Sequence, residues 1–524
     1  MRRSRDEFRL SAYSGDEGVL GVSQVQLNYL ATASDLGKAV GWSSGLALMW
    51  LPLWAVMFTA ATMGLVGYGV QWLVISNVIA LPYFVVFFLC LLAGCSICWF
   101  NTVCFVLCIK NFPSNRPLAL SLTVSFNGIS AALYNLAVNS LNPSTSAVYL
   151  LLNALVPLFT SIAALVPILR QPPVDPPDPD VVKRDQFTFL KLNLLAVITG
   201  LYLLFLHPSN ALMACFLFAG AVFLLILPLG IPGVVYARNW FRCTVYSSFP
   251  LDDLELHKEL LIRDSLANGL TNSSNIEGSP HSADKCCSCA TVIEKDRLVM
   301  LGQEHTAKML GRSLDFWLYY LAYFCGGTIG LVYSNNIGQI AQSLGHSLMN
   351  SKLITVYSAF SFFGRLLSAA PDFIRTMAYG CAPAYTIAFF VLVAFGGHQL
   401  AIQAGTALIG LSSGFIFAAA VSITSELFGP ESAGVNHNIL ITNIPIGSLI
   451  YGFLAALVYD SNAVSGVGLL ANSVVCMGRK CYFWTFVWWG CISLLGLASS
   501  VLLFMRTRPA YHRFEQSRTS TMLS

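Results

Sequence analysis

Arg365 is the charged residue whose position most strongly suggests a chemical role, because it lies near the middle of an apolar stretch, 353–372. A charge inside a membrane span costs roughly 2.5–3.5 kcal/mol on insertion scales, so such residues usually have a function. The guanidinium keeps its proton and offers a planar fork that fits a carboxylate. We predict that Arg365 binds or gates an anion in a central cavity. The alternative is a structural charge paired across the bundle, since Asp372 lies two helical turns away and is too distant for a direct local pair.

Asp35 and Lys38 are a second charged group in an apolar region. They are three residues apart and therefore share one face of a helix. Their spacing leaves two roles open, mutual neutralisation or a coupling role in which Asp35 takes up a proton. A position at the helix end, from which long side chains reach the interface, is the remaining alternative.

Neutral polar side chains within apolar segments are further candidates for lining a pathway, although each alone is more often an interhelical hydrogen bond. They are Asn101, Asn127, Gln339 and Asn443. Another group of charged residues lies at helix ends that we expect to be cytosolic, and we interpret these residues as gating or hinge positions rather than substrate contacts. They are Lys110, Arg116, Asp372 and Glu426.

Most of the 15 cysteines lie inside apolar runs, where cysteine behaves as a small hydrophobe. Cys476 and Cys481 instead lie in a polar stretch that we expect to face outward, where a disulfide is permitted. The CCSC sequence at 286–289 lacks the usual spacing of metal-binding cysteines, so we predict no metal site. No P-loop and no nucleophile–base combination is present in the sequence. We therefore predict neither an ATP-driven protein nor an enzyme, and no cofactor.

The composition indicates the environment in which these residues lie. Of the 524 residues, 56% are hydrophobic and 10% are charged, and the mean hydropathy is +0.67. Soluble domains carry roughly 25% charged residues, so this much apolar surface requires lipid. The net charge of +4 is scattered and gives no sign of nucleic-acid binding. The composition predicts an all-α polytopic membrane protein whose partner is the lipid bilayer.

Apolar runs divide the chain into spans, each of which needs roughly 20 residues to cross a bilayer. The sequence predicts thirteen of them, and Pro52 makes a tight joint between the first two. The segments are 30–51, 53–75, 81–109, 118–141, 147–169, 189–207, 211–237, 315–340, 353–372, 381–400, 404–428, 438–459 and 482–505.

The loops between these segments differ in charge. One set holds Lys110, Arg116 and the arginines of the C-terminal tail, whereas the alternating set holds only Lys352, Arg479 and Lys480. The positive-inside rule places the first set, and the C-terminus, in the cytosol. Thirteen spans would then place the basic N-terminus outside, against the same rule. We therefore expect a helix to be missing ahead of the first segment.

A short pattern occurs in both halves of the chain. SDLGKAVGWSSG (34–45) and SFFGRLLSAAPD (361–372) each contain a glycine followed by a cation, and a Leu-Gly pair precedes each of them. Internal repeats are common in secondary transporters. In the second half a full helix precedes the Leu-Gly pair, which again predicts an absent first helix. A chance match in a genuine thirteen-helix chain is the alternative.

Linkers and apolar blocks together predict six regions. They are an N-terminal bundle lacking its first helix (1–169), a proline-rich cytosolic linker (170–188), an inserted helix pair (189–237), a partly disordered cytosolic loop (238–314), a six-helix C-terminal bundle (315–505) and a cytosolic tail (506–524).

Seven strings occur in order along the chain and carry a family likeness. They are LATASDLGKAVGW (30–42), LPLWAV (51–56), VGYGVQWL (66–73), WFNTVCFVLCIKNFPSNR (99–116), NNIGQIAQSLG (335–345), FFGR (362–365) and SELFGPESAGVNHN (425–438). Taken in order, these strings resemble the plant nodulin-like (nuclear-fusion-defective-like) branch of the major facilitator superfamily. The resemblance covers nearly the whole chain and implies a major-facilitator-type two-bundle fold with an inserted helix pair, in which one helix precedes those seen here. The second half is also loosely similar to monocarboxylate and oxalate/formate carriers, which implies small organic anions as substrates.

These observations predict a secondary transporter that moves a small-molecule solute by alternating access. Arg365 favours an organic anion, and proton coupling stays open. The competing hypothesis is a receptor-like or scaffold protein that keeps the fold and does not transport. No sorting signal distinguishes the plasma membrane from the vacuolar membrane.

Overall fold

The computed structural model describes residues 24–113, 115–141, 147–169, 179–206, 211–246, 301–345, 350–369, 381–462, 464–465 and 474–523. Contacts divide the chain into two units, one of Met1–Val222 with Asp296–Ser524 and one of Phe223–Lys295. The larger unit holds every described helix apart from the second part of α10.

The first half and the inserted pair consist of long apolar helices. Pro52 and Pro82, both in extended conformation, directly precede α5 and α6, because proline cannot continue a helix from its preceding turn. The helices are α3 (Gln24–Val40), α4 (Ser43–Ala47), α5 (Leu53–Ile75), α6 (Tyr83–Asn111), α7 (Arg116–Leu141), α8 (Ala147–Leu169), α9 (Pro179–Phe205) and α10 (Ala211–Tyr246).

The second half contains two interrupted helical paths. A π-helical turn, η1, separates α14 from α15, and a turn separates α20 from α21. The elements are α13 (Ala307–Leu310), α14 (Leu314–Tyr323), η1 (Phe324–Thr328), α15 (Ile329–Ser343), α16 (Asn350–Leu367), α18 (Cys381–Phe395), α19 (Gln399–Phe428), α20 (Ala433–Leu440), α21 (Asn443–Ser461), the antiparallel strands β1 (Val464–Ser465) and β2 (Val474–Val475), and α22 (Lys480–Leu523).

Each predicted apolar segment falls on a helix, which confirms the all-α polytopic class. In the described part of the chain, eight helices are long and apolar enough to cross a membrane, and Leu212–Pro228 and Ala384–Phe395 are shorter apolar helices. The segment expected at 30–51 differs, because α3 ends at Val40 and α4 follows after a turn. Gly41 in that turn has low helix propensity and packs directly against Cys98.

The repeated glycine-cation pattern has the same structural setting in both halves. A Cβ atom on Gly37 of α3 would overlap the carbonyl oxygen of Leu91 in α6. A Cβ atom on Gly364 of α16 would likewise overlap the carbonyl oxygen of Leu411 in α19. Only glycine allows the two backbones to approach so closely.

The same two crossings also contain a glycine on the opposite helix. Gly94 of α6 packs against the carbonyl group of Ser34, and Gly414 of α19 packs against that of Ser361. The α3–α6 crossing and the α16–α19 crossing are therefore built alike, with glycines facing each other's backbone in both directions. This reciprocity supports the internal repeat predicted from the sequence.

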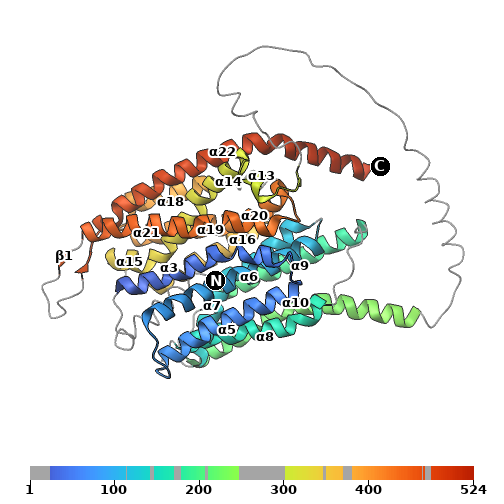
Figure 1. Ribbon diagram of the computed structural model, residues 1–524, viewed down its shortest axis with the longest axis horizontal. Helices are drawn as coiled ribbons and strands as arrows, with labels where there is room; N and C mark the ends of the chain where they lie inside the picture. The colour runs from blue at the N-terminus through green and yellow to red at the C-terminus, as the bar shows by residue number, and fades with distance from the viewer. Residues whose placement is uncertain are drawn as a thin grey trace, which may run out of the picture. The chain divides into compact units, whose positions relative to one another are not determined.

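The buried clusters indicate where the two halves pack together. One large cluster draws only on the second half, around Tyr333, and another only on the first half, around Tyr68. A third joins both halves, with Leu120 and Val124 of α7 against Val421 of α19. Figure 1 shows α22 and α18 on one side, α5 and α8 on the other, and α3, α16 and α7 between them.

Candidate functional site

Asp35 and Lys38 form an ion pair on α3, and both side chains are almost fully buried. The backbone carbonyl of Lys38 accepts a hydrogen bond from the Cys98 thiol of α6 at 3.2 Å. The charged groups are therefore held at the glycine crossing of the first half. Of the roles that the spacing left open, the observed ion pair corresponds to mutual neutralisation of Asp35 and Lys38.

Arg365 lies at the equivalent position of the second half, directly after Gly364. Its Nη1 donates a hydrogen bond at 3.3 Å to the carbonyl oxygen of Val124, which belongs to α7 of the first half. A Cβ atom added to Gly128 on the same helix would lie 3.2 Å from Nη1. The guanidinium is therefore in the seam between α16 and α7, where the two halves meet.

The inserted helix α9 lies against this seam, since it contacts both α7 and α16. Ala196 of α9, Ile129 of α7 and Phe362 of α16 belong to one buried cluster. Gly200 of α9 packs so closely on the Phe362 ring that a Cβ atom would overlap it. The inserted pair thus touches both halves beside Arg365.

The neutral polar candidates lie at three different helix contacts. Asn127 of α7 donates to Asn101 of α6 at 3.5 Å, so these two predicted residues do meet. Gln339 of α15 accepts a hydrogen bond from Tyr482 of α22 at 3.1 Å. Asn443 is fully buried and accepts one from Thr328 of η1 at 3.2 Å, while none of the described residues provides a hydrogen-bond partner for its Nδ2 atom.

Two of the charged helix-end candidates, Arg116 and Glu426, attract each other across the two halves. Arg116 begins α7, and Glu426 near the end of α19 is one of two carboxylates that interact with it electrostatically. Tyr511 of α22 donates to Glu426 at 2.9 Å. Lys110 at the end of α6 is exposed, and Asp372 lies outside the described residues. Arg116 of α7 therefore lies close enough to Glu426 of α19 for their charges to attract, although the structure shows no ion pair between these two described residues.

Glu304 is the second carboxylate near Arg116, and it was not among the residues predicted from the sequence. Its Oε1 accepts from the Glu431 backbone at 2.8 Å, and its Oε2 accepts from the Ser432 backbone at 3.0 Å and from the Ser432 hydroxyl. The carboxylate thus caps the turn that leads into α20, where an acidic group is favourable. Nothing in the local sequence identifies this partner, because the interacting residues are far apart along the chain.

Asp315 and Arg506 form a second buried ion pair that was not predicted. Arg506 Nε donates to Asp315 Oδ1 at 2.5 Å, and neither side chain is accessible to solvent beyond 1%. The pair joins α14 to α22 inside the second half. The sequence placed Arg506 at the start of a tail, whereas α22 continues to Leu523.

A polar cluster that includes Asn438 of α20 joins the halves. The hydroxyl groups of Ser44 in α4 and Thr102 in α6 are 2.7 Å apart. Asn438 Nδ2 of α20 donates to them at 3.2 and 3.3 Å. All three side chains are buried. These hydrogen bonds cross between the two bundles.

The predicted cysteine pair is bonded in the structure. Cys476, which lies before α22, forms a disulfide with Cys481 in the first turn of α22. No group of three or more potential metal ligands occurs among the residues that the structure describes.

Two repeated helical bundles, an inserted helix pair and cations at equivalent glycine crossings define a two-bundle polytopic membrane protein. The chain belongs to the nodulin-like family, as the motifs predicted. The nodulin-like family model matches residues 4–233, and the NFD4 C-terminal domain model matches residues 300–513.

One relative matches nearly the whole chain, and another matches about a third of it. Protein NUCLEAR FUSION DEFECTIVE 4 of Arabidopsis thaliana is 57% identical over 529 residues, which is 98% of this chain and 88% of that protein. Probable transporter MCH1 of Yarrowia lipolytica is 28% identical over 208 residues, which is 36% of this chain and 41% of that protein.

Among solved structures, the human organic anion transporter MFSD10 matches with a TM-score of 0.48 and 13% identity, covering 94% of this chain and 89% of that one. A variant of the E. coli fucose:proton symporter FucP matches with a TM-score of 0.43 and 12% identity, covering 97% and 95%.

Proposed function

We propose that this protein is a secondary transporter that carries a small organic anion across a membrane by alternating access. Family membership and the likeness to a probable yeast transporter support transport as the general function. One buried cluster around Tyr333 stays within the second half and one around Tyr68 stays within the first half, which supports a rocking motion. Proton coupling belongs to the same proposal, and uptake with and without a pH gradient tests it.

The observation that carries the choice of an anion is the position of Arg365. Its guanidinium lies in the seam between the halves and donates to the neutral carbonyl of Val124. A carboxylate accepts stronger, charge-assisted hydrogen bonds from the same group. An entering organic anion would therefore compete well for Arg365, and would change a contact that joins the two halves.

Direct transport measurements test this proposal. The purified protein is reconstituted in proteoliposomes, and uptake of radiolabelled acetate, lactate, oxalate and citrate is followed with and without a pH gradient. Arg365→Gln is compared with Arg184→Gln, which removes an exposed arginine from α9. We expect Arg365→Gln to lower uptake by about tenfold or more, because a hydrogen bond to a charged group contributes about 1.5–3 kcal/mol. Arg184→Gln is expected to keep the wild-type rate.

Two results would overturn the proposal. Equal uptake by wild type and a folded Arg365→Gln variant would exclude Arg365 from anion recognition. Uptake of none of the probes by folded wild-type protein would support the receptor-like or scaffold hypothesis.

A further inference from the structure

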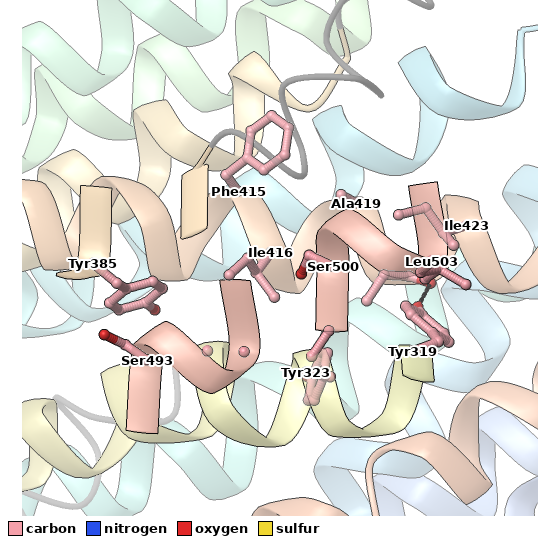
Figure 2. A pocket seen from close by; sticks show the side chains of 14 residues that line it. Tyr319, Tyr323, Tyr385, Phe415, Ile416, Ala419, Ile423, Ser493, Ser500 and Leu503 are labelled. Carbon is pink, nitrogen blue, oxygen red and sulfur yellow. Dashed lines mark hydrogen bonds between the residues drawn. The ribbon is translucent and has the colours of Figure 1, made fainter. Parts of the chain in front are cut away.

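A cavity inside the second-half bundle is too small for an organic ligand. It lies between α14, η1, α18, α19 and α22, and its volume of about 50 Å³ holds only a few water molecules. Figure 2 shows Tyr319 and Tyr323 among the lining residues, and the Tyr319 hydroxyl donates a hydrogen bond to the Ala420 carbonyl at 2.6 Å. A larger molecule therefore needs a site elsewhere, and the outer face of the inserted helix α9 has the side chains for one.

Lys191 is a cation in the apolar part of α9. Residues 192–205 contain no charged side chain, but as a helix they rise only about 21 Å, whereas a hydrocarbon core is roughly 30 Å thick. The span therefore has to extend back by about six residues, past Lys191. This side chain is exposed, and none of the ion pairs in the described part of the chain includes it. An ionisable residue at this depth usually has a function.

The ammonium group of Lys191 is directed toward the start of α9. Its Nζ atom lies 4.5 Å from the centroid of the Phe187 ring, which comes from the preceding turn and is 59% exposed. Electrostatic attraction to the face of the ring holds a cation in this position. Lysine side chains within a span reach the interface in the same way. The charge is therefore presented on the side of the bilayer where α9 begins, which the loop charges predict to be the cytosolic side.

Lys183, Phe187 and Lys191 are spaced four residues apart and therefore follow one face of α9. This face is turned away from the rest of the protein, because the buried residues Phe189 and Ala196 lie on the opposite side of the helix. Lys183 and Lys191 are both exposed. Beyond Lys191 the same face continues with exposed apolar side chains, those of Leu194, Ile198 and Leu201.

The acidic residues of α9 lie nearer to its start than Lys191 does. Asp185 is about 120° around the helix from Lys191, and the neighbouring Arg184 attracts it. Asp180 precedes Lys191 by eleven residues, which is about 16 Å along the helix axis. No carboxylate of its own helix therefore lies close to the Lys191 ammonium. A phosphate group that approaches from the bilayer does not have to displace an ion pair.

We propose that this face of α9 binds an anionic phospholipid, whose phosphate contacts Lys191 and whose acyl chains lie along the apolar residues beyond it. Lys183 extends the positive charge to the outer part of the headgroup. Cations beside a span attract the anionic lipids of the adjacent leaflet. Because Gly200 of α9 packs on Phe362, the bound lipid would anchor the helix that lies against the seam. The site does not depend on the proposed transport of anions.

Site-specific photocrosslinking tests this proposal without a transport assay. The full-length protein carries p-benzoylphenylalanine in place of Leu194 and is placed in nanodiscs made of equal parts of phosphatidylserine and phosphatidylcholine. Mass spectrometry then identifies the crosslinked lipid. We expect phosphatidylserine to exceed phosphatidylcholine about fivefold among the adducts, as one lysine near an anionic lipid provides. The same probe in place of Ile162, an exposed residue of α8, should report the ratio in the surrounding bilayer.

Charge variants of the protein with the Leu194 probe distinguish recognition from simple exposure. Lys191→Met should lower the lipid ratio about fivefold, toward one, whereas Lys191→Arg should keep it because either cation can contact a phosphate. Lys352→Met is the matched control, since it removes an exposed lysine from the start of α16 and should leave the ratio unchanged. Both lysines are exposed, so these variants should fold like the wild-type protein.

Three outcomes would contradict this lipid site. Equal ratios at Leu194 and Ile162 in the wild-type protein would show that Lys191 only extends to the interface. An enrichment of phosphatidylserine that persists in Lys191→Met would exclude Lys191 from headgroup recognition. Complete competition by soluble glycerophosphoserine at constant ionic strength would show that the headgroup alone is recognised, without the apolar face.

Discussion

Lys38 and Arg365 occupy the same position of the internal repeat, yet their surroundings differ. Each follows a glycine that packs on a neighbouring backbone. Lys38 pairs with Asp35 of its own helix, whereas Arg365 donates to Val124 in the opposite half. Three residues before Arg365, at the position of Asp35, the second half has Phe362. One bundle therefore keeps its cation in a local pair, and the other directs its cation to the seam.

The Asp35–Lys38 pair is a contact within one half, whereas the hydrogen bond from Arg365 to Val124 is a contact between the two halves. If the halves rock as bodies, the Asp35–Lys38 pair moves with α3 and is preserved. The hydrogen bond from Arg365 to Val124 must break or change, because α16 and α7 belong to different halves. A duplicated architecture can thus provide one structural cation and one that senses the state of the seam.

The largest expected effect tests the structural role of the first-half pair. Asp35→Asn removes the carboxylate from a buried ammonium group, and breaking a buried ion pair from one side costs about 3–5 kcal/mol. We expect a large fall in the thermal unfolding temperature of the purified protein in detergent. The double variant Asp35→Asn/Lys38→Met should recover most of that loss. An Asp35→Asn protein as stable as wild type would show that Asp35 does not carry this role.

The next effect tests whether the two crossings are equivalent. Gly37→Ala and Gly364→Ala each place a methyl group against a neighbouring carbonyl, and we expect each to destabilise the protein by about 1–3 kcal/mol. Gly452→Ala on α21 is the control, because no described atom lies within 4 Å of its added Cβ atom. The measurement is thermal unfolding of all three variants side by side. If Gly37→Ala left the stability unchanged while Gly364→Ala lowered it, the two crossings would not be equivalent, which would contradict the repeat.

The contacts that the sequence predicts are those encoded by neighbouring residues. Asp35 and Lys38 are three residues apart, so helix geometry alone brings them together. The glycine-cation pattern is equally local, and it was sufficient to align the halves. The apolar segments likewise follow from composition within a single window, which is why the helices were found where they were expected.

The contacts that were missed join residues that are distant in sequence. Asp315 and Arg506 are 191 residues apart, and each lies at a segment edge where a charge suggests solvent. Glu304 lies in a stretch assigned to a loop because of its polarity. The packing of the helices determines which partner each of these charged groups meets. Hydropathy along the sequence does not encode that packing.

A smaller effect tests whether Phe362 accounts for the difference between the halves. Phe362→Asp gives Arg365 a carboxylate three residues away, as Lys38 has, and Phe362→Asn is the neutral control of similar size. Both variants lose apolar packing against α9, so only the charge distinguishes them. We expect KM for a transported anion to be about tenfold higher in the Asp variant than in the Asn variant, because a local pair competes with the substrate for the guanidinium. Equal KM values would mean that Arg365 does not bind the anion.

The smallest effect concerns the inserted helix α9, whose Gly200 packs on Phe362 of the second half. Gly200→Ala pushes a methyl group toward the Phe362 ring, and a ring edge can shift, so we expect a loss of stability of only about 1 kcal/mol. Because α9 contacts both α7 and α16, the same change should alter the rate of uptake more than KM. Gly230→Ala on α10, where no described atom lies within 4 Å of the added Cβ, is the matched control. If both glycine variants transport at the wild-type rate, the inserted pair does not limit movement between α7 and α16. The difference between the two halves then rests on Arg365, whose hydrogen bond to Val124 joins the halves, whereas the Asp35–Lys38 pair stays within one of them.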